Sequence, residues 1–349
     1  MTRCRYILLS LALGMVLLIL LELLVRVSGL VDIRRTKGWG HSFECCGDLR
    51  PNKEILSLIA EEHPYVVSTN NLGLRNNEDA SVTDDDTLRI LAIGDSFTFG
   101  PYVANDETWP ARLEQLLRSE NPEQLVEVLN AGIASYTIAD ELAYLTDKGI
   151  TLNPDLIILE VTFNDIADIR KVQRGLFKRP KTGDWKVEAK WVVKNFLYDH
   201  SYFVAALVKL KNARVAQDIL DSRAQGDDAL YESILYGDNR EYEGAYEGAF
   251  AQFVSLAREH SIPIVVLFYP EARMVSLDPV EGEKTKMASF VVELGEKYDT
   301  PLLDASTFLR DADSRLTYLL PWNGHPSTTG YYLTAQNLLH FLKQNNLVQ

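Results

Sequence analysis

An apolar run that ends abruptly in small polar residues constrains the fold of this chain more than any other feature. Residues 89–93 (Arg-Ile-Leu-Ala-Ile) have the composition of a buried β-strand, and Gly94, Asp95 and Ser96 follow them directly. Open α/β sheets place ligands and chemistry at the carboxyl ends of such strands. Asp95 and Ser96 are also common helix caps, so this turn alone is consistent with both a cap and a nucleophile.

The chain beyond this turn alternates strands with helices. Apolar runs predict further strands at residues 125–129, 156–161, 262–269 and 301–304. Helical periodicity predicts helices at residues 108–120, 138–148, 242–260 and 284–298, and a last helix after Pro326. Because short turns join these elements, we expect right-handed crossovers and a parallel sheet.

Residues from about 166 to 239 interrupt the alternation with turns rich in lysine and arginine, followed by amphipathic stretches. We expect a helical insertion here. It could form a lid or a partner surface, or it could simply pack against the sheet edge, and the sequence leaves these alternatives open.

The N-terminal residues 6–25 form an apolar run that only Glu22 interrupts. The run is long enough to cross a bilayer as a helix, and no Ala-x-Ala site follows it. We therefore expect an uncleaved, single-pass membrane anchor within residues 1–30. A cleaved signal peptide and a buried core helix are the alternatives.

Basic residues lie on both sides of this run. The larger number follows it, and the positive-inside rule alone would then keep the bulk of the chain cytoplasmic, but long domains translocate regardless of nearby charge. We expect the domain that follows the anchor to be periplasmic or otherwise extracytoplasmic, with an orientation that the sequence does not settle. Residues from about 31 to 87 are expected to form a loosely structured lead-in or linker, because Pro and Asn-Asn interrupt any long periodic element.

Composition excludes several function classes. A net charge of −14 argues against a nucleic-acid partner, since phosphate binding needs clustered Lys and Arg. The three cysteines (Cys4, Cys45 and Cys46) predict neither a disulfide framework nor a metal site. No Walker or Gly-x-Gly-x-x-Gly motif supports a nucleotide. We expect no metal and no other cofactor.

Four turns would share one edge of the predicted sheet. Three strands end in polar or small residues, and a His-Pro turn opens the last helix: Gly94-Asp95-Ser96, Asn130-Ala131-Gly132, Phe163-Asn164-Asp165 and His325-Pro326. This set resembles the four blocks of the SGNH (GDSL-type) hydrolase family. The resemblance spans residues 70–342 apart from the insertion, and residues 71–75 (Asn-Leu-Gly-Leu-Arg) are similar to membrane-anchored bacterial members.

The resemblance implies a flavodoxin-like, three-layer α/β domain over residues 88–349, with a five-stranded parallel sheet. It also implies that Ser96 attacks an ester carbonyl while His325 accepts and returns the proton. The backbone N–H groups of Ser96 and Gly132 and the side-chain amide of Asn164 would form the oxyanion hole. We expect glycine at 132 because a side chain would crowd the substrate. Asp95 and Asp165 would support the site.

The sequence departs from the family pattern at the position of the aspartate that partners the catalytic histidine. Members carry an aspartate two or three residues before the histidine, where this chain has Asn323 and Trp322. In serine proteases, asparagine in place of the triad aspartate lowers turnover by about 10⁴. Three alternatives remain: a backbone carbonyl orients His325, another carboxylate such as Asp304 reaches it, or the protein is a weak or non-catalytic relative that binds acylated ligands.

The resemblance implies hydrolysis, or transfer, of a small acyl group on an oxygen ester. An O-acetylated glycan and a lipid-like ester are the substrate classes that it favours. The alternative α/β-hydrolase elbow (Gly-x-Ser-x-Gly) is excluded because Thr98 occupies its last position. A non-enzymatic role in polysaccharide assembly, with the insertion as contact surface for an unidentified protein partner, is the rival hypothesis.

Overall fold

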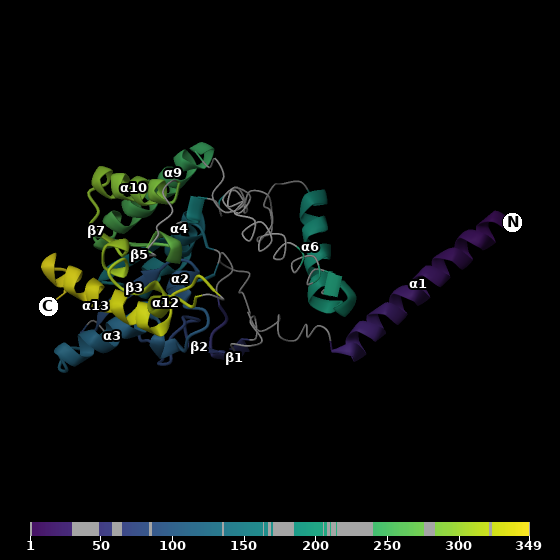
Figure 1. Cartoon of the computed structure of the whole chain (residues 1–349), viewed down its shortest axis with the longest axis horizontal. Helices are drawn as coiled ribbons and strands as arrows, with labels where there is room; N and C mark the ends of the chain where they lie inside the picture. Colours follow the sequence, from purple (N-terminus) through teal and green to yellow (C-terminus); the bar gives the residue numbers. More distant parts are fainter. Residues whose placement is uncertain are drawn as a thin grey trace. The chain divides into compact units, whose positions relative to one another are not determined.

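The structure is a computed structural model that describes residues 2–29, 49–57, 65–83, 86–134, 136–162, 164–166, 169, 185–204, 206–207, 210, 214, 240–275, 283–320 and 323–348 (Figure 1). The chain divides into two compact units. One comprises Met1–Gly38 and Gly175–Ile234, and the other comprises Trp39–Arg174 and Leu235–Gln349.

The second unit is built on a five-stranded sheet in which every strand pair is parallel. In spatial order β4-β3-β5-β6-β7, the strands are Val126–Asn130, Leu88–Ile93, Leu156–Thr162, Ile264–Tyr269 and Leu302–Asp304. This confirms the predicted five-stranded parallel sheet. The strand order reverses beside β3, and open α/β sheets bind ligands at such a switch point.

Helices cover both faces of this sheet, so the fold has three layers, as predicted. On one face lie α3 (Trp109–Glu120) and α13 (Thr328–Gln344), and on the other lie α4 (Ile138–Asp147), α9 (Arg240–Glu259) and α10 (Glu283–Lys297). Shorter helices are α2 (Ser96–Phe99), η1 (Asn105–Glu107), η2 (Gly149–Leu152), η3 (Ala272–Met274), α11 (Ser306–Leu309) and α12 (Ser314–Thr317).

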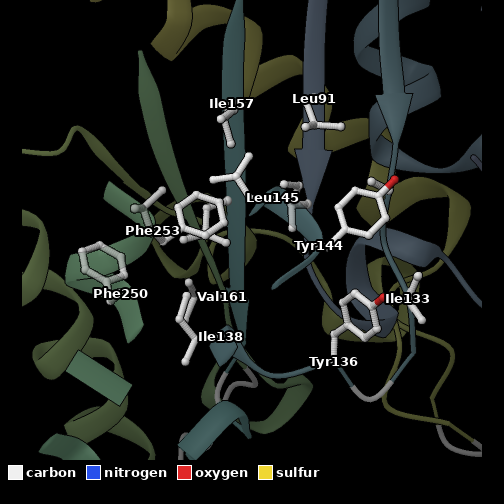
Figure 2. Packing of buried hydrophobic residues seen from close by; sticks show 14 of the residues in the cluster. Leu91, Ile133, Tyr136, Ile138, Tyr144, Leu145, Ile157, Val161, Phe250 and Phe253 are labelled. Carbon is white, nitrogen blue, oxygen red and sulfur yellow. The ribbon is translucent and has the colours of Figure 1, made fainter. Parts of the chain in front are cut away.

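Buried apolar side chains hold the layers together, and successive strand residues alternate between the two faces. Ile90 and Ala92 of β3 pack in the cluster under α3 and α13, whereas Leu91 and Ile93 pack in the cluster under α4 and α9. Figure 2 shows the second cluster, with Leu145 of α4 and Phe253 of α9 against the strands. The strands are apolar on both faces because both faces are covered, as is usual in parallel sheets.

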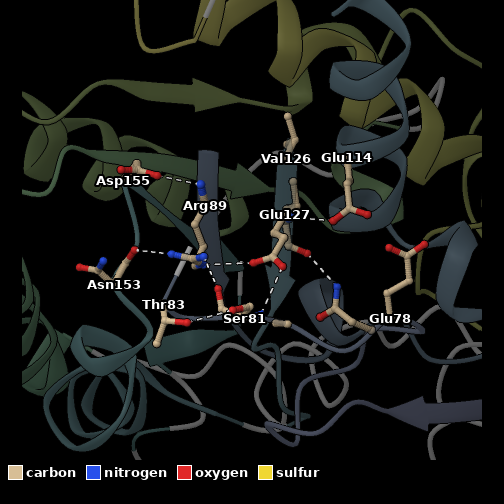
Figure 3. Close-up of polar contacts among 12 residues, drawn as sticks. Glu78, Ser81, Thr83, Arg89, Glu114, Val126, Glu127, Asn153 and Asp155 are labelled. Carbon is tan, nitrogen blue, oxygen red and sulfur yellow. Dashed lines mark hydrogen bonds and ion pairs between the residues drawn. The ribbon is translucent and has the colours of Figure 1, made fainter. Parts of the chain in front are cut away.

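A polar network closes the amino end of the sheet (Figure 3). The guanidinium of Arg89 on β3 is buried and lies 3.1 Å from Glu127 on β4, and it also donates to the Asn153 carbonyl at 3.1 Å. The Arg89 backbone N–H donates to Asp155 at 2.8 Å. Because these contacts join the starts of three neighbouring strands, they fix the register from which the carboxyl ends emerge.

The lead-in contains more regular structure than the sequence predicts. β1 (Lys53–Ser57) and β2 (Tyr65–Thr69) form an antiparallel pair, and the buried side chains alternate along β2. Asn105 of η1 ties the pair to the rest of the second unit, which we call the α/β unit, because its Nδ2 donates to the Ser68 carbonyl at 2.7 Å. Each strand has five residues, about half of them polar, so neither contains the long apolar run that identifies the central strands.

The first unit contains α1 (Thr2–Ser28) and α6 (Trp185–His200). Within the described part of the chain, α1 is the one helix long and apolar enough to cross a membrane, over Leu9–Ser28. Most of the predicted insertion lies outside the described residues, α6 and parts of residues 201–214 excepted.

Candidate active site

The turn after β3 presents Ser96 at the start of a short helix. Asp95 caps α2, because its Oδ1 accepts a hydrogen bond from the Phe97 backbone N–H at 2.8 Å. Gly100 ends the helix with φ +83°, a backbone conformation that favours glycine. Capping is therefore the role of Asp95, while the Ser96 side chain is left to make contacts outside the helix.

His325 reaches Ser96 from the turn before α13. Its Nε2 lies 2.9 Å from Ser96 Oγ, although 229 positions separate the two residues. Backbone bonds hold the turn in place, since the Leu319 N–H donates to the His325 carbonyl at 2.9 Å and the Asn323 N–H donates to the Leu319 carbonyl at 3.0 Å. The structure thus brings together the two residues that the sequence analysis names as nucleophile and base.

Asn323 occupies the position of the missing acid. Its Oδ1 lies 2.6 Å from His325 Nδ1 and also accepts the His325 backbone N–H at 2.9 Å. An amide oxygen only accepts hydrogen bonds, so Nδ1 carries the ring proton and Nε2 is free to take the proton of Ser96. The histidine is oriented by this side chain, not by a backbone carbonyl, and the Asp304 carboxylate instead accepts the Ser306 N–H at 2.8 Å.

Tyr102 fixes the other end of the Asn323 amide. Burial raises the pKa of Tyr102, and a hydrogen bond from the Asn323 side chain opposes that rise. Because the Asn323 oxygen faces His325, the amide nitrogen is the end left to donate this hydrogen bond to the Tyr102 oxygen. The Tyr102 ring packs edge-on to His325 with centroids 5.8 Å apart. Sequence reasoning missed Tyr102, and its φ of +69°, unusual for a tyrosine, is visible only in the structure.

Burial lowers the pKa of His325 from 6.5 to about 4. The base is therefore neutral at physiological pH, the form that can accept the Ser96 proton. Asn323 fills the position against Nδ1 at which a carboxylate would oppose this effect.

We expect the hydrolysis rate to follow this shifted titration. Protonation removes the base, so kcat/KM for p-nitrophenyl acetate should be constant at neutral pH and fall as the pH drops through about 4. Circular dichroism at each pH separates this loss from acid unfolding. An inflection near pH 6.5 in folded protein would contradict the assignment.

Gly132 lies against the backbone of α2, which is a different reason for glycine from the one predicted. A Cβ at this position would stand 2.3 Å from Phe99 N and 2.6 Å from Thr98 C. Asn130 joins the same two segments, because its Nδ2 donates to the Thr98 carbonyl at 3.0 Å and its Oδ1 accepts the Gly132 N–H at 3.0 Å. The Gly132 N–H thus already donates to Asn130 Oδ1. To stabilise an oxyanion as well, it would have to form a bifurcated hydrogen bond.

Asn164, the third predicted oxyanion donor, lies half-buried in the turn after β5, the strand that neighbours β3. Asp165 follows it and is buried, accepting hydrogen bonds from Thr162 Oγ1 at 2.7 Å and from Tyr246 Oη at 3.3 Å. The contacts of Asp165 are those of a residue that holds the turn.

A buried glutamate lies beneath the nucleophile turn, and sequence reasoning missed it. Oε2 of Glu160, on β5, accepts hydrogen bonds from Thr98 Oγ1 at 2.9 Å and from the Asp95 N–H at 3.3 Å. Gly94 makes this approach feasible, since a Cβ there would stand 2.4 Å from Glu160 Oε2. Burial, and then the charges of Asp95, Asp165 and Glu141, raise the pKa of Glu160 well above its usual value. Burial and the neighbouring carboxylates thus favour the protonated, neutral form of the Glu160 side chain.

Glutamine should therefore replace Glu160 without loss at neutral pH. Leucine should reduce the free energy of unfolding by about 2 kcal/mol or more, because the Thr98 hydroxyl and the Asp95 N–H lose their acceptor. Because the Glu160 pKa is raised on folding, wild-type stability falls as the pH rises from the unfolded-state pKa of about 4.3 to the folded-state pKa. Glu160→Gln should lack this loss in urea unfolding, and equal destabilisation by glutamine and leucine would contradict a neutral Glu160.

Arg75 holds the far end of α2. Its buried guanidinium donates to the carbonyls of Phe99, Gly100 and Val103 and to Asn105 Oδ1. Burial lowers the pKa of Arg75 to about 10, so it keeps its charge at neutral pH. These acceptors include the free carbonyls at the helix end, and Arg75 thereby fixes the helix that carries Ser96. Within the described residues, no group of three or more His, Cys, Asp or Glu side chains is placed to hold a metal.

Residues 92–333 match the profile of the GDSL-like Lipase/Acylhydrolase family. No curated protein sequence matches the chain significantly. Among solved structures, the chain is similar to an acetylxylan esterase from Geobacillus stearothermophilus (15% identity, TM-score 0.44, covering 73% of this chain and 93% of the other). It is also similar to TesA (15% identity, TM-score 0.44, covering 73% of this chain and 98% of the other).

Proposed function

Since this chain belongs to the GDSL-like lipase/acylhydrolase family, we propose that it is a serine esterase that cleaves a small acyl group from an oxygen ester. The observation that carries the proposal is the chain of contacts from Ser96 through His325 to Asn323, at 2.9 Å and 2.6 Å. It supplies a nucleophile, a neutral base and a group that fixes the tautomer of the base.

The proposed reaction has two halves. Ser96 Oγ attacks the ester carbonyl carbon while His325 Nε2 takes its proton, and the resulting imidazolium then protonates the departing alcohol oxygen. Water next attacks the acyl-serine, giving its proton to Nε2, and Ser96 leaves with that proton as the carboxylic acid is released. Acyl transfer would differ only in that a sugar hydroxyl takes the place of water.

The oxyanion formed in each half needs fixed N–H donors. We propose the backbone N–H groups of Ser96 and Gly132 and the side-chain amide of Asn164 for this role, in a site where Asn130, Glu160 and Arg75 hold the surrounding turns. Removal of one such donor typically raises the barrier by about 3–4 kcal/mol.

We further propose that α1 anchors the chain in a membrane, with the α/β unit on the extracytoplasmic side. The length and apolar character of Leu9–Ser28 support an anchor. A membrane location favours an O-acetylated envelope glycan or a lipid-like ester as substrate.

Covalent labelling tests the proposal most directly. Full-length protein in detergent is treated with a fluorophosphonate, which phosphonylates activated serines with loss of fluoride, and peptide mass spectrometry locates the adduct. We expect the adduct on Ser96, and none in Ser96→Ala or when p-nitrophenyl acetate is in excess. If folded wild-type protein neither labels nor hydrolyses the ester, the non-catalytic, ligand-binding alternative holds instead.

A further inference from the structure

The N-terminal helix carries one carboxylate inside its apolar span. Glu22 belongs to Leu9–Ser28, and at 1.5 Å per residue it lies about 9 Å along the helix axis from Ser28. Charged side chains in membrane spans are costly and are almost always satisfied by a partner. The identity of that partner shows which other part of the chain lies at the same depth in the bilayer as Glu22.

The partner of Glu22 is in the insertion. Glu22 Oε1 accepts the Tyr202 N–H at 2.9 Å, while Oε2 accepts the Ser201 hydroxyl at 2.7 Å and the Phe203 N–H at 3.0 Å. N–H groups in the first turn of a helix have no partner within that helix, so the carboxylate satisfies them. One turn further along α1, the Arg26 guanidinium carbon lies 4.7 Å from the centre of the Tyr202 ring.

Both helices that meet at Ser201 expose large apolar side chains. α6 ends at His200, just before the contact, and residues 202–204 begin the next helical stretch. The exposed apolar side chains on these segments, which we call the apolar face of the insertion, are Trp185, Val193, Phe196, Leu197, Leu207 and Leu210. All of them except Trp185 lie within about three turns of the Glu22 contact, at helical spacing.

We propose that the apolar face of the insertion lies in the bilayer that α1 crosses, with lipid acyl chains as its partner, and that Glu22 docks the insertion there. The inference rests on the proposed anchoring by α1. The contact point lies within the apolar span, so the helices that leave it do so at the depth of the acyl chains or their boundary. Apolar side chains exposed at that depth meet hydrocarbon, and the exposed Lys186 and Lys190 on α6 suit the headgroup region.

The proposal also explains Glu22 itself. Hydrogen bonds between α1 and the insertion are of no use to a signal peptide that is removed, because cleavage would leave the Ser201–Phe203 donors without their acceptor. The proposal therefore requires that α1 stays attached to the chain.

Spin-label accessibility in nanodiscs tests the lipid contact. Full-length protein with Cys4, Cys45 and Cys46 replaced by serine receives one cysteine, at Leu207 or Leu210. Leu125, on the α/β unit, is the matched control, because it is 58% exposed against 50% and 60% for the other two. We expect labels at 207 and 210 to collide more often with oxygen than with a water-soluble nickel chelate, and the reverse at 125. Labels at 207 and 210 that behave like the label at 125 would overturn the proposal.

The docking role of Glu22 is tested on the same labels. Glu22→Leu keeps an apolar helix but removes both acceptors, so the label at 207 should move toward water, whereas Glu22→Gln, which keeps one acceptor oxygen, should change it less. Leu24→Ala on the exposed side of α1 is the control and should change nothing. An unchanged label in Glu22→Leu, or an intact mass that lacks residues 1–28, would overturn the docking. Ser96→Ala should give the same spin-label accessibilities as the wild type. Failure of the esterase proposal is therefore detected separately, by the fluorophosphonate experiment on Ser96.

Discussion

Alanine at Ser96 should lower kcat/KM for p-nitrophenyl acetate by about 10³, and alanine at His325 should lower it by a similar factor. The double variant should lose no more than either single variant. The reason is the 2.9 Å contact between Oγ and Nε2, through which the two side chains act as one unit. Once either is removed, the other has no proton to give or take, and only binding and oxyanion stabilisation remain. Initial rates with purified full-length protein measure the effect.

Losses that multiply in the double variant would show that the two residues act independently. His260→Ala controls for the general effect of removing a histidine, because His260 lies after α9 on the exposed surface of the α/β unit. Its rate should equal that of the wild type. Thermal unfolding of each variant shows whether a lower rate reflects lost chemistry or lost stability. Ser96 and His325 lie at the edge of the core and not inside it, so alanine at these positions should leave the stability nearly unchanged.

Aspartate at position 323 should raise kcat by about 10-fold to 100-fold. A carboxylate at 2.6 Å from Nδ1 stabilises the imidazolium that forms as Ser96 attacks, which the neutral amide of Asn323 does not do. The gain is smaller than the factor of about 10⁴ known for the triad aspartate of serine proteases, because much of that factor reflects a wrong tautomer. Here the His325 N–H already holds the amide oxygen toward the ring.

The same variant should move the pH profile. A carboxylate raises the pKa of His325 from about 4, so the acid inflection of kcat/KM should shift upward. Asn323→Ala is the companion variant, and it should be slower than the wild type because nothing then fixes the tautomer. An Asn323→Asp variant that folds normally yet has the wild-type rate and inflection would show that Asn323 does not serve the base.

The strands and the central helices were predictable because each has a local signature. An apolar run such as residues 156–161 is buried on both faces, and helical spacing in residues 108–120 matches α3 within one residue. Ser96 and His325 could be named because each stands at the end of such an element. The sequence does not show which group accepts the hydrogen bond from His325 Nδ1. The Asn323 amide can face the ring with its oxygen or its nitrogen, and its contacts with the His325 N–H and with Tyr102 fix that orientation in the fold.

Residues that support the site were missed for a related reason. Glu160 reads as one polar residue in an apolar strand, and only the short distance to Thr98 shows what it does. The Arg75 guanidinium binds backbone carbonyls of residues that lie 24 to 28 positions later in the chain. Every residue has a backbone carbonyl, so the sequence does not show which of them a side chain binds. The antiparallel β1–β2 pair was missed because its strands are short and half polar.

Because of the Tyr102 hydroxyl, position 323 can hold either asparagine or aspartate. A phenol can accept a hydrogen bond from an amide nitrogen or, after rotating its hydrogen, donate one to a carboxylate oxygen, so the neighbouring residue can change from asparagine to aspartate without repacking. One nucleotide substitution interconverts the two codons. A lineage could thus adjust the turnover of this protein in either direction by a single reversible step, while the nucleophile, the base and the surrounding fold stay as they are.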